Sequence, residues 1–147
     1  MEKIITITLN PAIDKSTTAP FVAPEKKIRC ESPKFEPGGG GINVSRALKK
    51  LGGTSTAIFL AGGHTGKFLE SLVKQEGIDC VVIPFSGYTR ENLIVMDESN
   101  DQQYRFGYSH LDLSSMAALY AHLCRITDAV LIRKSDTDAS ARRCRFT

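Results

Sequence analysis

Gly38-Gly39-Gly40-Gly41-Ile42-Asn43-Val44-Ser45 is the stretch that decides the fold of this 147-residue chain. Four consecutive glycines let the backbone pass close to a ligand, and the start of the following helix offers free amide groups that attract anions. Apolar residues then recur at i, i+3, i+4 and i+7: Val44, Ala47, Leu48 and Leu51. This spacing predicts an amphipathic helix, which Gly52-Gly53 ends. The glycines alone are a weak signal, because a plain flexible turn would have the same composition.

Two better-known glycine loops do not fit this part of the chain. The dinucleotide-binding pattern GxGxxG requires a glycine where Asn43 stands. The phosphate-loop pattern GxxxxGK[ST] is suggested by Gly66-Lys67, but Ala61 and Phe68 occupy its first and last positions. Both patterns are therefore excluded.

Short apolar segments alternate with helical ones on either side of the glycines. Strands are predicted at residues 4–9, 56–60, 80–84 and 128–132, and further helices around 68–76 and from Ser114 or Ser115 to about Arg125. Strands that alternate with helices predict an α/β architecture with a parallel sheet. Residues 15–37 and the predicted hairpin at 92–97 and 103–108 depart from this rhythm, and we expect them to form a separate small β-layer.

Composition excludes several classes of protein and of site. No run approaches 18 apolar residues, and the N-terminus alternates unlike a signal peptide, so the cytoplasm is the expected location and no membrane partner is expected. The four cysteines and three histidines show no metal-ligand or catalytic spacing, and we expect no metal site: Cys30, Cys80, Cys124, Cys144, His64, His110 and His122.

The net charge of +3 does not indicate a nucleic-acid partner. Residues 133–147 hold five basic and two acidic residues, so residues 1–132 hold 14 of each. A nucleic-acid-binding domain needs a basic face on its folded body. The excess lies entirely in residues 133–147, which show no periodicity and are expected to form an aberrant, disordered tail.

Beyond the glycines, Gly39–Ser45 with Gly52 and Gly62 at fixed distances resembles the first signature of the pfkB carbohydrate kinase family. Five segments are similar to the bacterial 6-phosphofructokinases of that family: residues 8–14, 27–30, 35–41, 57–63 and 103–106. The resemblance covers about residues 3–131. It implies the N-terminal half of a ribokinase-like, three-layer α/β domain over residues 1–132, whose segments at about 15–35 and 88–108 form a β-lid.

The resemblance also assigns substrate-binding roles to residues at matching positions: Asp14, Gly38, Gly39, Asn43, Arg90 and Arg105. Asp14 corresponds to a carboxylate that accepts hydrogen bonds from sugar hydroxyls, and the glycines to positions where a side chain would collide with the sugar. Arg90 and Arg105 correspond to lid arginines, whose guanidinium groups suit a phosphate. Lys27 corresponds to a further phosphate-handling position, without deciding which phosphate it meets.

The resemblance implies an ATP-dependent kinase that phosphorylates fructose 6-phosphate with ATP and Mg²⁺. Kinases of fructose 1-phosphate or tagatose 6-phosphate remain alternatives. A non-catalytic sugar-phosphate-binding module, or one that forms a homodimer through the lid, is an alternative of another class, and a poorly folded remnant is a third.

The family's second signature, a Gly-Ala-Gly-Asp turn, does not occur in this sequence. Its aspartate is the general base in the family, so we assign no catalytic residue here and expect the chain to have negligible turnover. The ATP site, which follows downstream in the family, is expected to be mostly missing.

Overall fold

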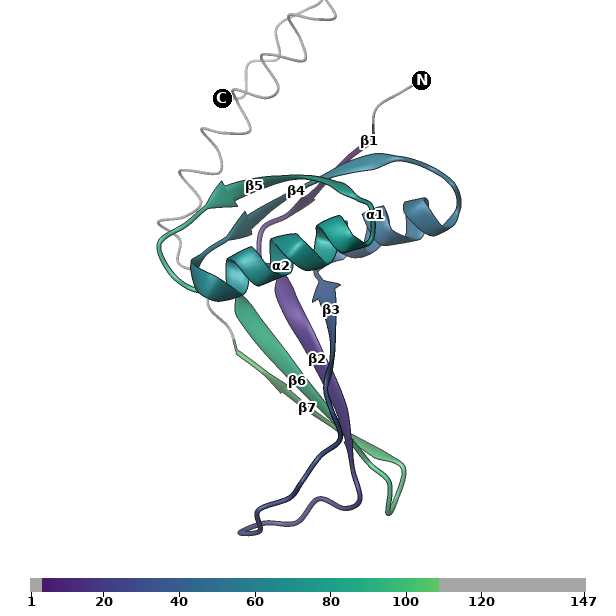
Figure 1. Cartoon of the computed structure of the whole chain (residues 1–147), viewed down its shortest axis with the longest axis vertical. Helices are drawn as coiled ribbons and strands as arrows, with labels where there is room; N and C mark the ends of the chain where they lie inside the picture. Colours follow the sequence, from purple (N-terminus) through teal and green to yellow (C-terminus); the bar gives the residue numbers. More distant parts are fainter. Residues whose placement is uncertain (1–3, 109–147) are drawn as a thin grey trace, which may run out of the picture. The chain divides into compact units, whose positions relative to one another are not determined.

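The computed structural model describes residues 4–108, which form two sheets and two helices (Figure 1). The elements are β1 (Ile4–Thr8), β2 (Ala12–Ala19), β3 (Lys34–Gly38), α1 (Gly40–Lys50), β4 (Ser55–Ala61), α2 (Gly63–Gln75), β5 (Asp79–Pro84), β6 (Arg90–Asp97) and β7 (Gln102–Gly107). Neither helix in this range is long and apolar enough to cross a membrane. The predicted helix after Ser114 or Ser115, the strand at 128–132, the domain boundary at 132 and the tail lie outside the described residues.

The first sheet is parallel, with strand order β1-β4-β5. Its register pairs Thr6 with Ala57 and Thr8 with Phe59, so these side chains share one face of the sheet. Both helices cover that face, where Ile42 of α1 and the α2 residues Leu69 and Val73 enclose Phe59 in the main core (Figure 1). The predicted strands, helices and parallel pairing of this layer are confirmed.

Helix α1 forms where predicted, but the predicted apolar stripe is not its buried face. Val44 and Leu51 are 51% and 84% exposed, whereas α1 buries Ile42 and Ser45. The Ser45 hydroxyl lies 2.7 Å from that of Thr6, so a small polar side chain satisfies its partner and lets the helix approach β1. Apolar periodicity predicted the helix correctly and its buried side wrongly, because close approach here depends on small residues.

The glycines let α1 begin directly against β1. A β-carbon at Gly41 would lie 2.5 Å from the Ile7 carbonyl oxygen, and one at Gly39 would lie 2.5 Å from Thr8 Cγ2. Gly39 also has φ +127°, a conformation that residues with side chains rarely adopt. Because Gly39 has no side chain to cap the helix, the Ile42 amide donates instead to Thr8 Oγ1 at 3.0 Å.

The second sheet has the strand order β3-β2-β6-β7 and contains the segments that departed from the α/β rhythm. Strand β2 pairs antiparallel with β3 and parallel with β6. Strands β6 and β7 form the predicted antiparallel hairpin, which is confirmed. This sheet packs on α2 through Phe35 of β3, whose ring lies 5.3 Å from that of Phe68 in an edge-on contact.

The glycine run gives a matched pair of stability tests. Gly41→Ala should lower the free energy of unfolding by about 1–3 kcal/mol, because the added methyl overlaps the β1 backbone. Gly40→Ala should leave it unchanged or raise it by up to about 1 kcal/mol, since nothing lies within 4 Å of the added carbon and alanine favours the helix. Chemical denaturation of the two variants checks this, and equal losses would contradict the close approach of α1 to β1.

Candidate functional site

The site that the sequence predicts is built around the contact between Asp14 and Gly38. Asp14 of β2 is paired in register with Glu36, two residues before Gly38 ends β3. A β-carbon at position 38 would lie 2.9 Å from Asp14 Cγ and would overlap Oδ2. The carboxylate therefore occupies space that only a glycine at position 38 leaves open.

Asn92 also contacts Asp14, and the sequence analysis did not identify it. We call the group formed by Asp14, Gly38 and Asn92 the Asp14 corner. Asn92 is paired with Asp14 in register, and its Nδ2 donates to Asp14 Oδ1 at 2.8 Å. An ionised carboxylate has about four acceptor positions, so one bond leaves capacity for ligand hydroxyls. The available signal was alternation, because Asn92 lies two residues after Arg90 and therefore on the same face of β6.

Arg90 lies on the Asp14 face of the second sheet with a largely unused guanidinium group. It is paired in register with Ala12, two residues from Asp14. Its Nη2 donates to the Asn10 carbonyl at a long 3.4 Å, and its buried Nε has no hydrogen-bond partner among residues 4–108. A buried donor without a partner is costly, so this group is suited to an external acceptor such as an anion.

Arg105 and Asn43 extend the corner in two directions. Arg105 of β7 is paired in register with Ile94, which is two residues after Asn92 on β6. Arg105 therefore lies on the same face of the second sheet as Asp14, and it is solvent-exposed. Asn43 is also exposed and lies one turn into α1, where its amide bonds to the Gly39 carbonyl at 2.8 Å. The structure thus brings Gly38 directly against Asp14, and Gly39 and Asn43 follow Gly38 along the chain.

Lys27 is not part of this corner. It is exposed, in the segment 20–33 that leaves β2 after Ala19. Asp14 and Ala19 are five residues apart on an extended strand, which corresponds to about 16 Å. Figure 1 shows the connection between β2 and β3 at the end of the second sheet farthest from α1.

Asp97, a buried carboxylate, anchors the start of that segment. Its Oδ2 accepts the Val22 amide at 2.9 Å, and its Oδ1 accepts the amide and hydroxyl of Ser99 at 2.9 and 2.6 Å. The hydrogen bond from the Ser99 hydroxyl is the main cause that lowers the pKa of Asp97 below its ordinary value. The ionised side chain therefore ties the β6–β7 turn to the segment that carries Lys27.

Arg46 of α1 binds the C-terminal end of β3, next to Asp14 of β2. Its guanidinium donates to Glu36 Oε1 at 2.9 Å, to the Pro37 carbonyl at 3.3 Å and to Glu76 Oε2 at 2.8 Å. The bond from Arg46 lowers the pKa of Glu36, and the bond to Glu76 raises that of Arg46. Glu36 and Arg46 therefore remain charged near neutral pH.

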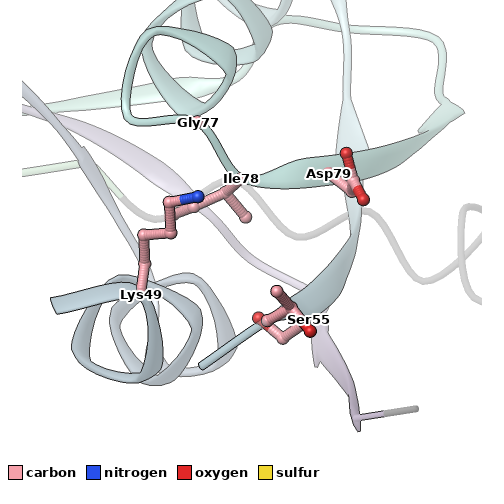
Figure 2. Close-up of a pocket in the computed structure, with 6 residues that line it drawn as sticks. Lys49, Ser55, Gly77, Ile78 and Asp79 are labelled. Atoms are coloured by element: carbon pink, nitrogen blue, oxygen red, sulfur yellow. The ribbon is translucent and has the colours of Figure 1, made fainter. Parts of the chain in front are cut away.

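Two pockets lie away from the corner. One of about 170 Å³ lies where β4 and β5 begin, and Figure 2 shows Lys49 reaching toward Gly77 and Ile78, with Ser55 and Asp79 at the strand starts. Ligands of such sheets bind at the carboxyl ends of the strands, so this pocket is at the wrong edge. The other, of about 250 Å³, is lined by Lys15, Thr17, Cys30, Glu31, Pro33, Leu93 and Val95. Successive residues of a strand point to opposite faces of a sheet. Lys15 and Leu93 directly follow Asp14 and Asn92 on their strands, so this pocket lies on the face of the second sheet opposite Asp14.

Within residues 4–108, no group of three or more His, Cys, Asp or Glu side chains could hold a metal ion. Cys30 and Cys80 are free thiols, and burial raises the pKa of Cys80 above its ordinary value. A protonated thiol is a poor nucleophile, so the geometry gives Cys80 no chemical role at the site.

Comparison with known proteins identifies relatives of this arrangement. Residues 4–130 match the pfkB family carbohydrate kinase domain. The chain is 50% identical over 106 residues to ATP-dependent 6-phosphofructokinase isozyme 2 of Escherichia coli K12, which covers 72% of this chain and 34% of that protein. It therefore spans about a third of the length of this relative.

Solved structures agree with this match. The crystal structure of Escherichia coli phosphofructokinase-2 in complex with fructose-6-phosphate superimposes with a TM-score of 0.68 at 50% identity, covering 72% of this chain and 35% of the other. A candidate ribokinase from Agrobacterium tumefaciens, only 16% identical, superimposes with a TM-score of 0.62 over 74% of this chain and 37% of its own. The second match concerns the fold alone and confirms the ribokinase-like α/β prediction.

The Asp97 anchor should respond to acid in a predictable direction. Because folding lowers the pKa of Asp97, its contribution to stability is complete above the ordinary aspartate value of about 3.9 and is lost as pH falls through the lowered pKa. The Val22 amide, followed by NMR during acidification, should therefore shift below about pH 3.9. Asp97→Asn should abolish this step, and a Val22 transition at or above the ordinary value would contradict the anchor.

Proposed function

The chain belongs to the pfkB family of carbohydrate kinases, and we propose that residues 4–108 form the sugar-phosphate-binding part of an ATP-dependent 6-phosphofructokinase. The reaction of such an enzyme transfers the γ-phosphate of ATP to the C1 hydroxyl of fructose 6-phosphate. The 50% identity to a 6-phosphofructokinase favours this substrate over fructose 1-phosphate or tagatose 6-phosphate.

The observation that carries the proposal is the Asp14 carboxylate, which is partly exposed and lies directly against Gly38. Asn92 occupies one of its acceptor positions and orients the group. The remaining lone pairs suit the hydroxyls of a sugar, and Gly39 lets the ring approach the backbone. Asn43, one turn into α1, supplies an amide that would bond the same ligand.

The arginines supply the preference for a phosphorylated sugar. Arg90 has an unpartnered Nε within the described range and lies on the same face as Asp14, and Arg105 follows on β7. Guanidinium groups bind phosphate through paired, charge-assisted hydrogen bonds, which a neutral sugar would leave unused. In this proposal the second sheet acts as a lid that brings both arginines to the phosphoryl end of the substrate.

Lys27 and the expected ATP site lie apart from the residues proposed to bind the sugar phosphate. The position of Lys27, beyond the far end of β2, favours a phosphate other than the one held by Arg90. The family implies ATP and Mg²⁺, but residues 4–108 offer no cluster of carboxylates for the ion, and we derive no step through it. Because the Gly-Ala-Gly-Asp turn does not occur in the sequence, we expect residues 1–147 on their own to bind the sugar phosphate without phosphorylating it.

Calorimetry with fructose 6-phosphate tests the proposal. Asp14→Asn and Arg90→Gln should each weaken binding by roughly 10- to 100-fold, the range expected for losing a hydrogen bond to a charged group. Lys49→Gln, in the pocket at the opposite edge, is the matched control and should leave the affinity unchanged. A coupled kinase assay on the same samples should show no turnover.

Two results would contradict this assignment. One is an affinity that Asp14→Asn leaves intact, and the other is equal affinity for fructose and fructose 6-phosphate. Ordinary kinase activity of the purified chain would overturn the expectation of binding without turnover.

We further propose that the face of the second sheet opposite Asp14 binds a second copy of the chain. The 250 Å³ pocket beside Leu93 and Val95 lies on this face, and Phe106, paired in register with Leu93, is 52% exposed. A solved relative is described as the tetrameric inhibited form of Escherichia coli phosphofructokinase-2, which favours a second copy as the occupant. Apolar side chains at this position would be covered by the same face of the partner.

Light scattering tests this association. The chain should measure as a dimer, and Phe106→Ser should shift it toward the monomer by removing an apolar contact. Tyr88→Ser removes a side chain that is also exposed but lies outside the second sheet, and it should not change the mass. A monomeric chain, or equal effects of both substitutions, would contradict this interface.

A further inference from the structure

We propose that Arg46 is a positioning residue for the sugar-phosphate site, because it fixes the Glu36–Gly38 end of β3 against α1 and so keeps Asp14 and Gly38 in place. No sequence motif assigned a role to this residue. The consequence for fructose 6-phosphate rests on the proposed function, whereas the consequence for the unliganded corner does not.

The guanidinium group of Arg46 uses each of its three nitrogens. Two of them, Nη2 and Nη1, donate to the side chain of Glu36 and to the main-chain carbonyl of Pro37. The third, Nε, donates to Glu76, the residue that caps the end of α2. The side chain is only 19% exposed, so these bonds are shielded from competition by water more than those of a surface ion pair.

Both bonds to β3 reach residues that adjoin the corner. Glu36 is the register partner of Asp14, and Pro37 is bonded through its carbonyl carbon to Gly38. A displacement of this strand end would carry Gly38 away from the Asp14 carboxylate or into it. Arg46 therefore acts on the site through β3, because its three hydrogen bonds within residues 4–108 go to Glu36, Pro37 and Glu76 and not to Asp14.

Helix α1, which carries Arg46, is itself held in place against β1. The Thr6–Ser45 and Thr8–Ile42 hydrogen bonds hold it to β1, and Ser45 is fully buried directly before Arg46. By contrast, β3 ends at Gly38 and is followed by Gly39, and glycines give the backbone more freedom than other residues would. A planar guanidinium that binds both a side chain and a carbonyl restrains this freedom in a way that a lysine would not.

Glu76 offers a matched comparison within the same ion-pair cluster. It accepts one bond from Arg46 at 2.8 Å, as Glu36 does at 2.9 Å, but it joins α1 to α2 and not to β3. Glu36→Ala and Glu76→Ala each remove one bond to the same arginine, and Glu36→Ala also removes the exposed ion pair of Glu36 with Lys34 at 3.3 Å, for which Lys34→Ala is the control. Only the first removes a bond to the strand end beside Asp14.

The first experiment follows the unliganded chain by NMR. Arg46→Gln and Glu36→Ala should shift the Gly38 amide signal and the side-chain amide signal of Asn92, which reports its bond to Asp14. Glu76→Ala should leave both signals in place, and Arg46→Lys should restore them only in part. If Arg46→Gln does not fold, Glu36→Ala carries the test, because it keeps the bond between Arg46 and Glu76.

The second experiment titrates the same variants with fructose 6-phosphate. Arg46→Gln and Glu36→Ala should weaken binding on the order of tenfold, and Glu76→Ala should weaken it by less than about twofold. This difference in affinity should remain even if the two Glu→Ala substitutions lower the melting temperature equally. Equal effects of Glu36→Ala and Glu76→Ala, or unshifted Gly38 and Asn92 signals, would overturn the proposal. If the unmodified chain binds no fructose 6-phosphate while the signals shift as expected, the proposed function fails and the positioning role stands.

Discussion

The arrangement depends on the steric relation between Asp14 and Gly38. In every residue other than glycine, a β-carbon would occupy the space that the Asp14 carboxylate takes. The last residue of β3 therefore has to be a glycine, and the N-cap of α1 follows it directly at Gly39. The partly exposed Asp14 carboxylate is oriented by Asn92, and Arg90 lies on the same face.

The rest of residues 4–108 supports this corner from two sides. Beneath it, α1 approaches β1 closely because Gly41 and Ser45 are small and because Thr6 and Thr8 satisfy the polar groups at the contact. Above it, β2 carries Asp14 in the middle of the second sheet, between β3 and β6. The proposed ligand site thus combines the start of α1 with an inner strand of the second sheet.

Local patterns predicted the elements of the fold well. Alternation and spacing located β1, β4, β5, both helices and the β6–β7 hairpin, because each depends on residues close in sequence. Strands β2 and β3 were not located individually, since residues 15–37 were expected only to join a small β-layer. The buried side of α1 was predicted wrongly, since the choice between the Val44–Leu51 stripe and the Ile42–Ser45 face depends on what β1 presents. Asn92 and Arg46 were missed for a similar reason: their partners, Asp14 and Glu36, are distant in sequence or lie on another element. The resemblance to a family supplied candidate residues, and only the strand register placed Asp14, Arg90 and Arg105 on one face.

The most direct test of this account is an NMR titration of the whole chain with fructose 6-phosphate. The account predicts saturable shifts of the Gly38 and Gly39 amides and of the Asn92 side-chain amide, with inorganic phosphate alone producing much smaller changes at these positions. Shifts confined to the Lys49 pocket, or no saturable change at the Asp14 corner, would contradict it.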